Sequence, residues 1–172
     1  MDFFDVVEAR RSIRAFQERP VEEEKIACIM DAVNLAPSAG NLQAYEVYLV
    51  TRNDLRADLA NAALDQEFIA QAPLVLVFCA HPARSAVRYG RRGERLYALQ
   101  DATIACTFAT LAAAALGLGS VWVGAFDEEA VRRVLDAPRG VIPIAILPIG
   151  YPAENPPRRP RRGADDFVHR VG

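Results

Sequence analysis

A continuous apolar run at residues 73–80 is the feature that most constrains how this chain can fold. The run reads Pro-Leu-Val-Leu-Val-Phe-Cys-Ala, and prolines stand near both of its ends, at Pro73 and Pro82. A half-exposed strand alternates apolar with polar residues, whereas an unbroken run of β-forming residues is typical of a strand buried on both faces. We therefore predict a buried strand over Pro73–Ala80.

Further strands and helices are predicted on both sides of this run. Apolar patterns between turn residues predict strands over Tyr45–Val50, Ser120–Val123 and Ile142–Ile149. Pro143 and Pro148 suit the ends of the last strand better than its middle, because proline offers no N–H to a sheet. Helices are expected after Asp2, after Pro20, over residues 54–71 with a break near Asp65, over Leu96–Leu116 with Gly117 as its stop, and from Asp127 to about Leu135.

Length and composition indicate one globular domain over residues 1–172. The chain has 172 residues, of which 52% are hydrophobic, and only residues 152–163 are biased toward Pro and Arg. The most apolar stretch, Ile104–Leu118, is shorter than the roughly 20 residues that a membrane span needs. The acidic N-terminus lacks the features of a secretory signal, so we expect a cytoplasmic protein. A net charge of −2 also argues against a dedicated nucleic-acid-binding protein.

The sequence offers no pattern for a metal site or a catalytic triad. Cys28, Cys79 and Cys106 are widely separated and have apolar neighbours, so we expect buried, unreactive thiols. His81 and His169 show no two-ligand spacing, which predicts no metal. No Ser-His-Asp or Cys-His arrangement is recognisable, and no catalytic side chain is assigned.

Arginine and small polar residues gather in two early segments. Arg10, Arg11, Ser12 and Arg14 directly follow the first predicted helix. Guanidinium groups can grip a phosphate at two oxygens, so this cluster suits an anionic ligand, although such clusters are commonly only solvated. One helix later, the loop at residues 38–41 is small enough for its donors to approach a ligand closely.

Two later arginine-rich segments have a simpler interpretation. Residues 84–95 contain several arginines, two glycines and no apolar periodicity, which predicts a mobile, partly helical surface connection. Its arginines could help to attract an anionic nucleotide, but a simply solvated surface is the preferred interpretation. The run at residues 158–162 could by itself be a solvated tail or an adventitious nucleic-acid patch.

Five motifs in this order resemble those of the FMN-dependent nitroreductases, flavoproteins that pass electrons from a nicotinamide nucleotide to nitro compounds, quinones or similar acceptors. The resemblance runs nearly end to end, with Ala44 and Tyr45 standing where the family usually has Pro and Trp. The motifs are Arg10-Arg11-Ser12-Ile13-Arg14-x-Phe16, Ala36–Gln43, Tyr97–Asp101, Gly117–Asp127, and Ile149–Glu154 followed by Arg159–Arg162.

The resemblance implies a fold and an assembly. The fold is α+β, a three-layer α/β/α arrangement with a central, mostly antiparallel sheet flanked by helices. Residues 152–172 are expected to be an extended C-terminal arm that crosses to a partner subunit, which implies a homodimer. A dimer also explains how a short chain could enclose the tricyclic flavin ring, which needs walls on both sides.

The resemblance further implies that Arg10, Ser12, Arg159 and Arg161 hold the FMN phosphate, with Arg11 near the ribityl chain. Arg14 would lie at the pyrimidine edge of the ring, where negative charge accumulates on reduction and a cation raises the electron affinity. The remaining implied contacts are Ser38, Ala39 and Asn41 from the partner's loop, backbone groups of Gly124 and Ala125 near N5, and Gln66 as a further polar contact.

The implied reaction is transfer of electrons from NAD(P)H to a nitroaromatic, quinone or related acceptor, with both substrates using one site in turn. A dinucleotide-binding fold of the Rossmann type is excluded, because Gly117-x-Gly119 lacks the third glycine and precedes a strand. Relatives with other flavin chemistry, non-catalytic FMN binders, and a non-flavin protein that binds another phosphate remain as alternatives.

Overall fold

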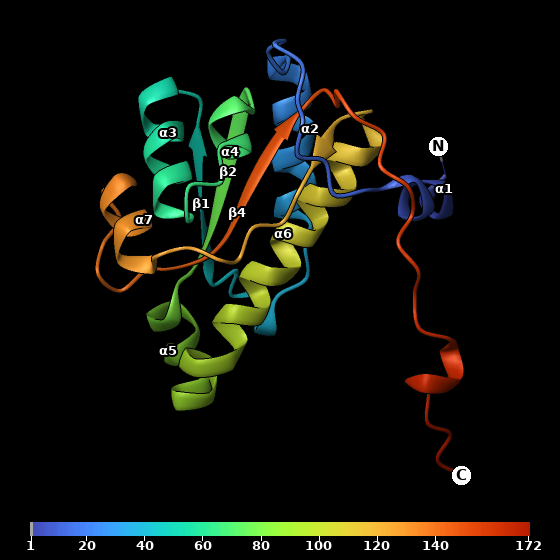
Figure 1. Ribbon diagram of the computed structural model, residues 1–172. Helices are drawn as coiled ribbons and strands as arrows, with labels where there is room; N and C mark the ends of the chain where they lie inside the picture. The colour runs from blue at the N-terminus through green and yellow to red at the C-terminus, as the bar shows by residue number, and fades with distance from the viewer. Residues whose placement is uncertain (1) are drawn as a thin grey trace.

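A four-stranded antiparallel sheet of order β1-β2-β4-β3 lies at the centre of the computed structural model, which describes residues 2–172 (Figure 1). Strand β2 pairs with β1 along its whole length and with β4 on its other side. The strands are β1 Tyr45–Val50, β2 Leu74–Ala80, β3 Gly119–Ser120 and β4 Ile142–Gly150.

Strand β2 confirms the predicted double burial. Each of its residues is at most 1% exposed. Leu74, Leu76 and Phe78 join the core on one face of the sheet, whereas Val75 and Val77 belong to the core on the other. Because alternate side chains of a strand point to opposite faces, an apolar run of this kind can be satisfied only by helices on both sides of the sheet.

The helices form the two outer layers, which confirms the α+β fold (Figure 1). The first layer consists of α2 Glu23–Asn34 and α6 Ala98–Ala115, and the second contains α3 Asn53–Ala62, α4 Phe68–Gln71 and α7 Glu128–Val134. The remaining α-helices are α1 Phe3–Ala9, which Asp2 caps, and α5 Pro82–Arg92, and short 3-10 turns stand at Ala39–Asn41 and Ala164–Asp166.

The predicted strand over Ser120–Val123 is interrupted. Ser120 pairs with Ile149 and Val123 pairs with Ile146, so both ends of the predicted strand pair with β4 in the same register. In that register Pro148 stands opposite Val121, and on this side of β4 Ile146 donates its N–H to Val123 O at 2.9 Å. Pro148 has no N–H to continue the ladder, which ends β3 at Ser120.

The expectation that Pro143 and Pro148 suit the ends of the strand holds for Pro143, which is the second residue of β4, but not for Pro148, which pairs with Val75 inside the ladder. The ladder between β2 and β4 shifts register between Phe78 and Cys79, and Pro143 pairs with Cys79 directly beside this irregularity. A break in the ladder accommodates a residue that cannot donate.

The segment at residues 84–95 is not the partly helical connection that its composition predicted. Helix α5 runs to Arg92, bends at Gly90 (φ +52), and continues through a π-helical turn, Gly93–Tyr97, into α6. A Cβ at Gly93 would lie 2.5 Å from Ser85 O, so glycine permits this turn to pack on α5.

Pro82–Ala115 is, by length and composition alone, the one helical stretch among residues 2–172 that could cross a membrane. In this fold α6 is a core helix, because Ala102, Ala105 and Ala109 are buried against the sheet. The thiols of Cys79 and Cys106 are buried as predicted, but the prediction was wrong for Cys28, which is exposed on α2.

The C-terminal arm leaves the sheet after β4 and extends away from the body (Figure 1). Its base is fixed to the N-terminal segment, because Gln17 N donates to Tyr151 O at 2.9 Å and Ala153 N donates to Ala15 O at 2.9 Å. Beyond residue 156 every residue of the arm is exposed. The arm is therefore anchored to the N-terminal segment at its base, and Arg158 adds an exposed ion pair with Glu8 of α1 at 3.0 Å.

Candidate functional site

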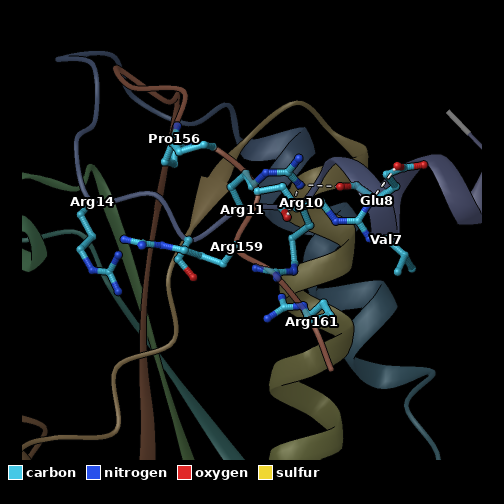
Figure 2. A pocket seen from close by; sticks show the side chains of 11 residues that line it. Val7, Glu8, Arg10, Arg11, Arg14, Pro156, Arg159 and Arg161 are labelled. Atoms are coloured by element: carbon cyan, nitrogen blue, oxygen red, sulfur yellow. Dashed lines mark hydrogen bonds and ion pairs between the residues drawn. The ribbon is translucent and has the colours of Figure 1, made fainter. Parts of the chain in front are cut away.

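A hollow of about 430 Å³ lies between the segment that follows α1 and the C-terminal arm (Figure 2). It collects six of the predicted cofactor-binding residues, four of them predicted for the phosphate, one for the ribityl chain and one for the ring, although the two segments are separated by almost the whole chain. These six residues are Arg10, Arg11, Ser12, Arg14, Arg159 and Arg161.

The first wall of the hollow is held by one buried residue. Ile13 is 6% exposed, its N–H donates to Ser120 O at 3.0 Å, and Ser12 forms a parallel bridge to Ser120. A Cβ at Gly119 would lie 2.8 Å from the Ile13 side chain, so glycine is required for this approach. Because Ile13 is fixed against the sheet, its neighbour Ser12 lines the hollow.

The second wall is anchored by Glu154 at the base of the arm. One oxygen of its carboxylate accepts the backbone N–H groups of Arg14 and of Ala15, the latter at 3.2 Å. Phe16 also forms an antiparallel bridge with Pro152. These contacts place the arm beside the arginines of the N-terminal segment, so that Arg159 and Arg161 reach the same hollow.

The hollow carries positive charge that residues 2–172 leave largely uncompensated. Burial lowers the pKa of the half-buried Arg10, and the nearby charges of Arg161 and Arg11 lower it further. The only carboxylate that lines the hollow is Glu8, which is paired with Arg158 at 3.0 Å. Crowded guanidinium groups of this kind are the donor set that a phosphate dianion satisfies.

Arg14 connects this hollow to a second group of predicted residues. Its guanidinium carbon lies 5.9 Å from the centre of the Phe68 ring in α4. Just before α4, Gln66 donates its side-chain N–H to Ala125 O at 3.2 Å. Gln66 and Ala125 are therefore in contact, and Gly124 precedes Ala125 in the same turn.

The loop with Ser38, Ala39 and Asn41 lies apart from the arginine hollow. Ser38 and Ala39 line a different hollow, of about 580 Å³, together with residues of α6, and the two hollows share no residue. Gly40 and Asn41 have positive φ angles of 57° and 56°. Within the described chain the loop is thus not part of the site formed around Arg10.

Buried Asp101 fixes the shape of this loop. Its carboxylate is 1% exposed and accepts Ala39 N at 2.9 Å and Ala44 N at 3.3 Å. Ser38 Oγ additionally accepts the Gln43 N–H at 3.0 Å. Small donors at residues 38–41 are therefore held in a defined conformation with their outer side open.

The sequence did not identify Thr107 and Thr110 of α6 as neighbours of Arg10. A second small hollow of about 230 Å³ contains Arg10 and Ser12, and Thr107, Thr110 and Trp122 contribute to its walls. Both threonine hydroxyls donate to carbonyls of their own helix, at 2.9 and 2.8 Å. The only signal in the sequence was that threonines interrupt an alanine-rich helix.

Comparisons with known proteins agree on one family. The model of the Nitroreductase family matches residues 7–151. The FMN reductase [NAD(P)H] of Bacillus subtilis is 34% identical over 173 residues, covering 92% of this chain and 69% of that protein.

Solved structures give the same result for the fold. NfrA2 of B. megaterium superposes with a TM-score of 0.92 at 29% identity, covering 100% of this chain and 75% of that one. The NADPH:FMN oxidoreductase of Vibrio harveyi, solved in complex with NAD+, has a TM-score of 0.90 at 29% identity, covering 99% of this chain and 77% of that one.

Proposed function

The chain belongs to the nitroreductase family of oxidoreductases, and from this membership we propose that it is an FMN-dependent enzyme that passes electrons from NAD(P)H to a nitroaromatic, quinone or related acceptor. The observation that carries the proposal is the arginine hollow, whose charge the described residues leave uncompensated. FMN ends in a phosphate that carries close to two negative charges at neutral pH, and it matches this donor set.

Each residue of the hollow has a role in this proposal. Arg10, Ser12, Arg159 and Arg161 hold the phosphate, and Arg11 contacts the ribityl chain. When bound, the flavin itself supplies the hydride and electron chemistry, so the protein needs no nucleophile and no dedicated general acid. The chain contributes binding, orientation and electrostatics.

Arg14 sets the electrostatics at the ring end of the proposed site. Glu154 accepts its backbone N–H, and its exposed side chain places the guanidinium carbon 5.9 Å from the Phe68 ring, which connects the arginine hollow to α4 and the Gln66–Ala125 contact. A fixed positive charge beside the pyrimidine edge of the ring favours the reduced, more negative form of the cofactor.

We propose a homodimer in which the loop at residues 38–41 completes the partner's flavin site. Two observations support this arrangement: the loop lies apart from the arginine hollow of its own chain, and the C-terminal arm extends away from the body (Figure 1). With walls from both subunits the site is accessible to one planar substrate at a time, so nucleotide and acceptor bind alternately.

The test is stopped-flow mixing of the anaerobic, FMN-loaded protein with NADH and with NADPH. We expect at least one nucleotide to bleach the oxidised flavin bands, and a nitroaromatic or a quinone to restore them. Steady-state data should give parallel lines in double-reciprocal plots.

The absorbance spectrum of the purified protein, together with this stopped-flow experiment, separates the alternatives. A purified protein without flavin bands, and unable to take up added FMN, would indicate a protein that binds another phosphate. A flavin that neither nucleotide bleaches would indicate a non-catalytic FMN binder and would refute the reductase.

A further inference from the structure

Arginines are concentrated on α5 and the π-helical turn, on a surface that we call the α5 basic face. All of its arginines are exposed, and Glu94 is the one acidic residue between residues 82 and 97, in a chain whose net charge is −2. The α5 basic face consists of Arg84, Arg88, Arg91, Arg92 and Arg95.

Carboxylates neutralise little of this charge. Among the described residues, only Arg84 of the α5 basic face forms an ion pair, with Glu46 at 3.1 Å. Arg88 lies over the Tyr89 ring at 5.5 Å, and Arg92 donates to the Tyr97 hydroxyl at 3.0 Å. These contacts orient the guanidinium groups and leave their charge available to an anion.

The helix dipole explains only part of this arrangement. Cations are favoured in the last turn of a helix, where Arg91 and Arg92 stand. Arg84 lies in the first turn of α5, where the dipole disfavours positive charge, so its presence there is not a helix-stabilising feature.

The α5 basic face borders the loop at residues 38–43. A Cβ at Gly40 would lie 2.5 Å from Tyr89 Oη and 3.0 Å from Arg88 Nη1, and Arg84 donates to Gln43 O at 3.0 Å. This is the loop that, in the proposed function, forms a wall of the flavin site. The unpaired arginines therefore stand at the rim of that site.

We propose that the α5 basic face binds the phosphate groups of the nicotinamide dinucleotide, an inference that rests on the proposed function. A dinucleotide whose nicotinamide lies on the flavin must place its adenosine phosphates outside the ring pocket. Arg88 and Arg91 can take either the pyrophosphate or a 2′-phosphate, because both present oxygens that match a guanidinium fork. The α5 basic face thereby sets the affinity of the protein for the nicotinamide nucleotide and the preference between NADH and NADPH.

Calorimetric titration of the FMN-loaded protein with adenosine 2′,5′-bisphosphate and with ADP tests the proposal without requiring flavin reduction. The variant is Arg88→Gln with Arg91→Gln, which removes two charges from exposed positions. The matched control is Arg52→Gln, an exposed arginine before α3 at the opposite end of the sheet. We expect the double variant to weaken at least one fragment about tenfold and the control to stay within about twofold of the wild type.

The outcomes are distinct. A loss for the bisphosphate alone identifies the 2′-phosphate as the ligand, and an equal loss for both fragments identifies the 5′-phosphate or pyrophosphate end. Wild-type protein that binds neither fragment, equal affinities in wild type and double variant, or an equal loss in the Arg52→Gln control would overturn the proposal. Failure of the reductase would show separately, as a wild-type flavin that neither nucleotide bleaches.

Discussion

Arg10 is the residue in which the proposed phosphate site can be tested most directly. Its half-buried guanidinium shares the hollow with Arg161 and Arg11, and burial together with these two charges lowers its pKa. Three like charges held together without a counter-ion repel one another, and a bound dianion reverses that cost. FMN should therefore contribute to the stability of this end of the molecule.

We predict that Arg10→Ala and Arg161→Ala each weaken FMN binding by about tenfold or more, because a charge-assisted hydrogen bond contributes about 1.5–3 kcal/mol. Fluorescence titration of the apoprotein measures the dissociation constant. Arg162→Ala is the control, since Arg162 is on the same arm but does not line the hollow. Unchanged FMN affinity in both test variants would refute the placement of the phosphate.

The sequence could predict the arginines of the hollow but not the residues that hold them in place. Arg10 and Arg161 belong to conspicuous clusters that a family resemblance brought together. Glu154 accepts backbone N–H groups 139 and 140 residues earlier in the chain. Because Glu154 accepts only backbone N–H groups, no partner side chain in the sequence indicates this contact.

At the scale of elements, Asp101 shows how the longest helix organises a loop of the proposed site. Its carboxylate, in the first turn of α6, accepts the N–H groups of Ala39 and Ala44 from the loop between α2 and β1. The loop conformation therefore depends on a residue 62 positions after Ala39 and 57 after Ala44.

We predict that Asp101→Asn lowers the free energy of unfolding by about 1–3 kcal/mol, because Ala39 and Ala44 donate to different oxygens of the carboxylate and asparagine replaces one of these acceptors with an NH2 group. Urea unfolding of the apoprotein measures the change. Asp58→Asn, an exposed change of the same chemistry on α3, should stay within about 0.5 kcal/mol of the wild type. Equal unfolding free energies for wild type and Asp101→Asn would contradict the role of this carboxylate.

Element prediction succeeded where one local pattern decided the structure and failed where a distant partner did. The apolar run of β2 and the acidic cap of α7 predicted their elements correctly. The interruption at Val121 could not be anticipated, because it depends on which strand pairs with Pro148. Residues 84–95 likewise seemed irregular because they contain two glycines. In the structure Gly90 allows a bend within α5, and Gly93 allows the following turn to pack on Ser85.

At the scale of the whole molecule, the C-terminal arm is the part of the chain that its own fold does not explain. Phe167 and Val168 are 53% and 52% exposed, and Val171 is 97% exposed. In the proposed homodimer these side chains, which follow the helical turn Ala164–Asp166, are the surface that the partner subunit covers. The composition of residues 152–163 predicted the arm, but one chain alone cannot specify what the arm contacts.

We predict that truncation after Gly163 weakens the homodimer and releases FMN together, even though Arg159 and Arg161 are retained. Sedimentation velocity with detection at the flavin absorbance measures both quantities in one experiment. Phe167→Asp with Val168→Asp is a gentler variant that keeps the chain length, and it should act in the same direction, because charges on a buried contact are costly. Arg170→Gln, an exposed change of the same arm, serves as the control. A truncated protein that stays dimeric with unchanged FMN content, or a monomer that retains stoichiometric FMN, would show that the arm does not complete a partner's site.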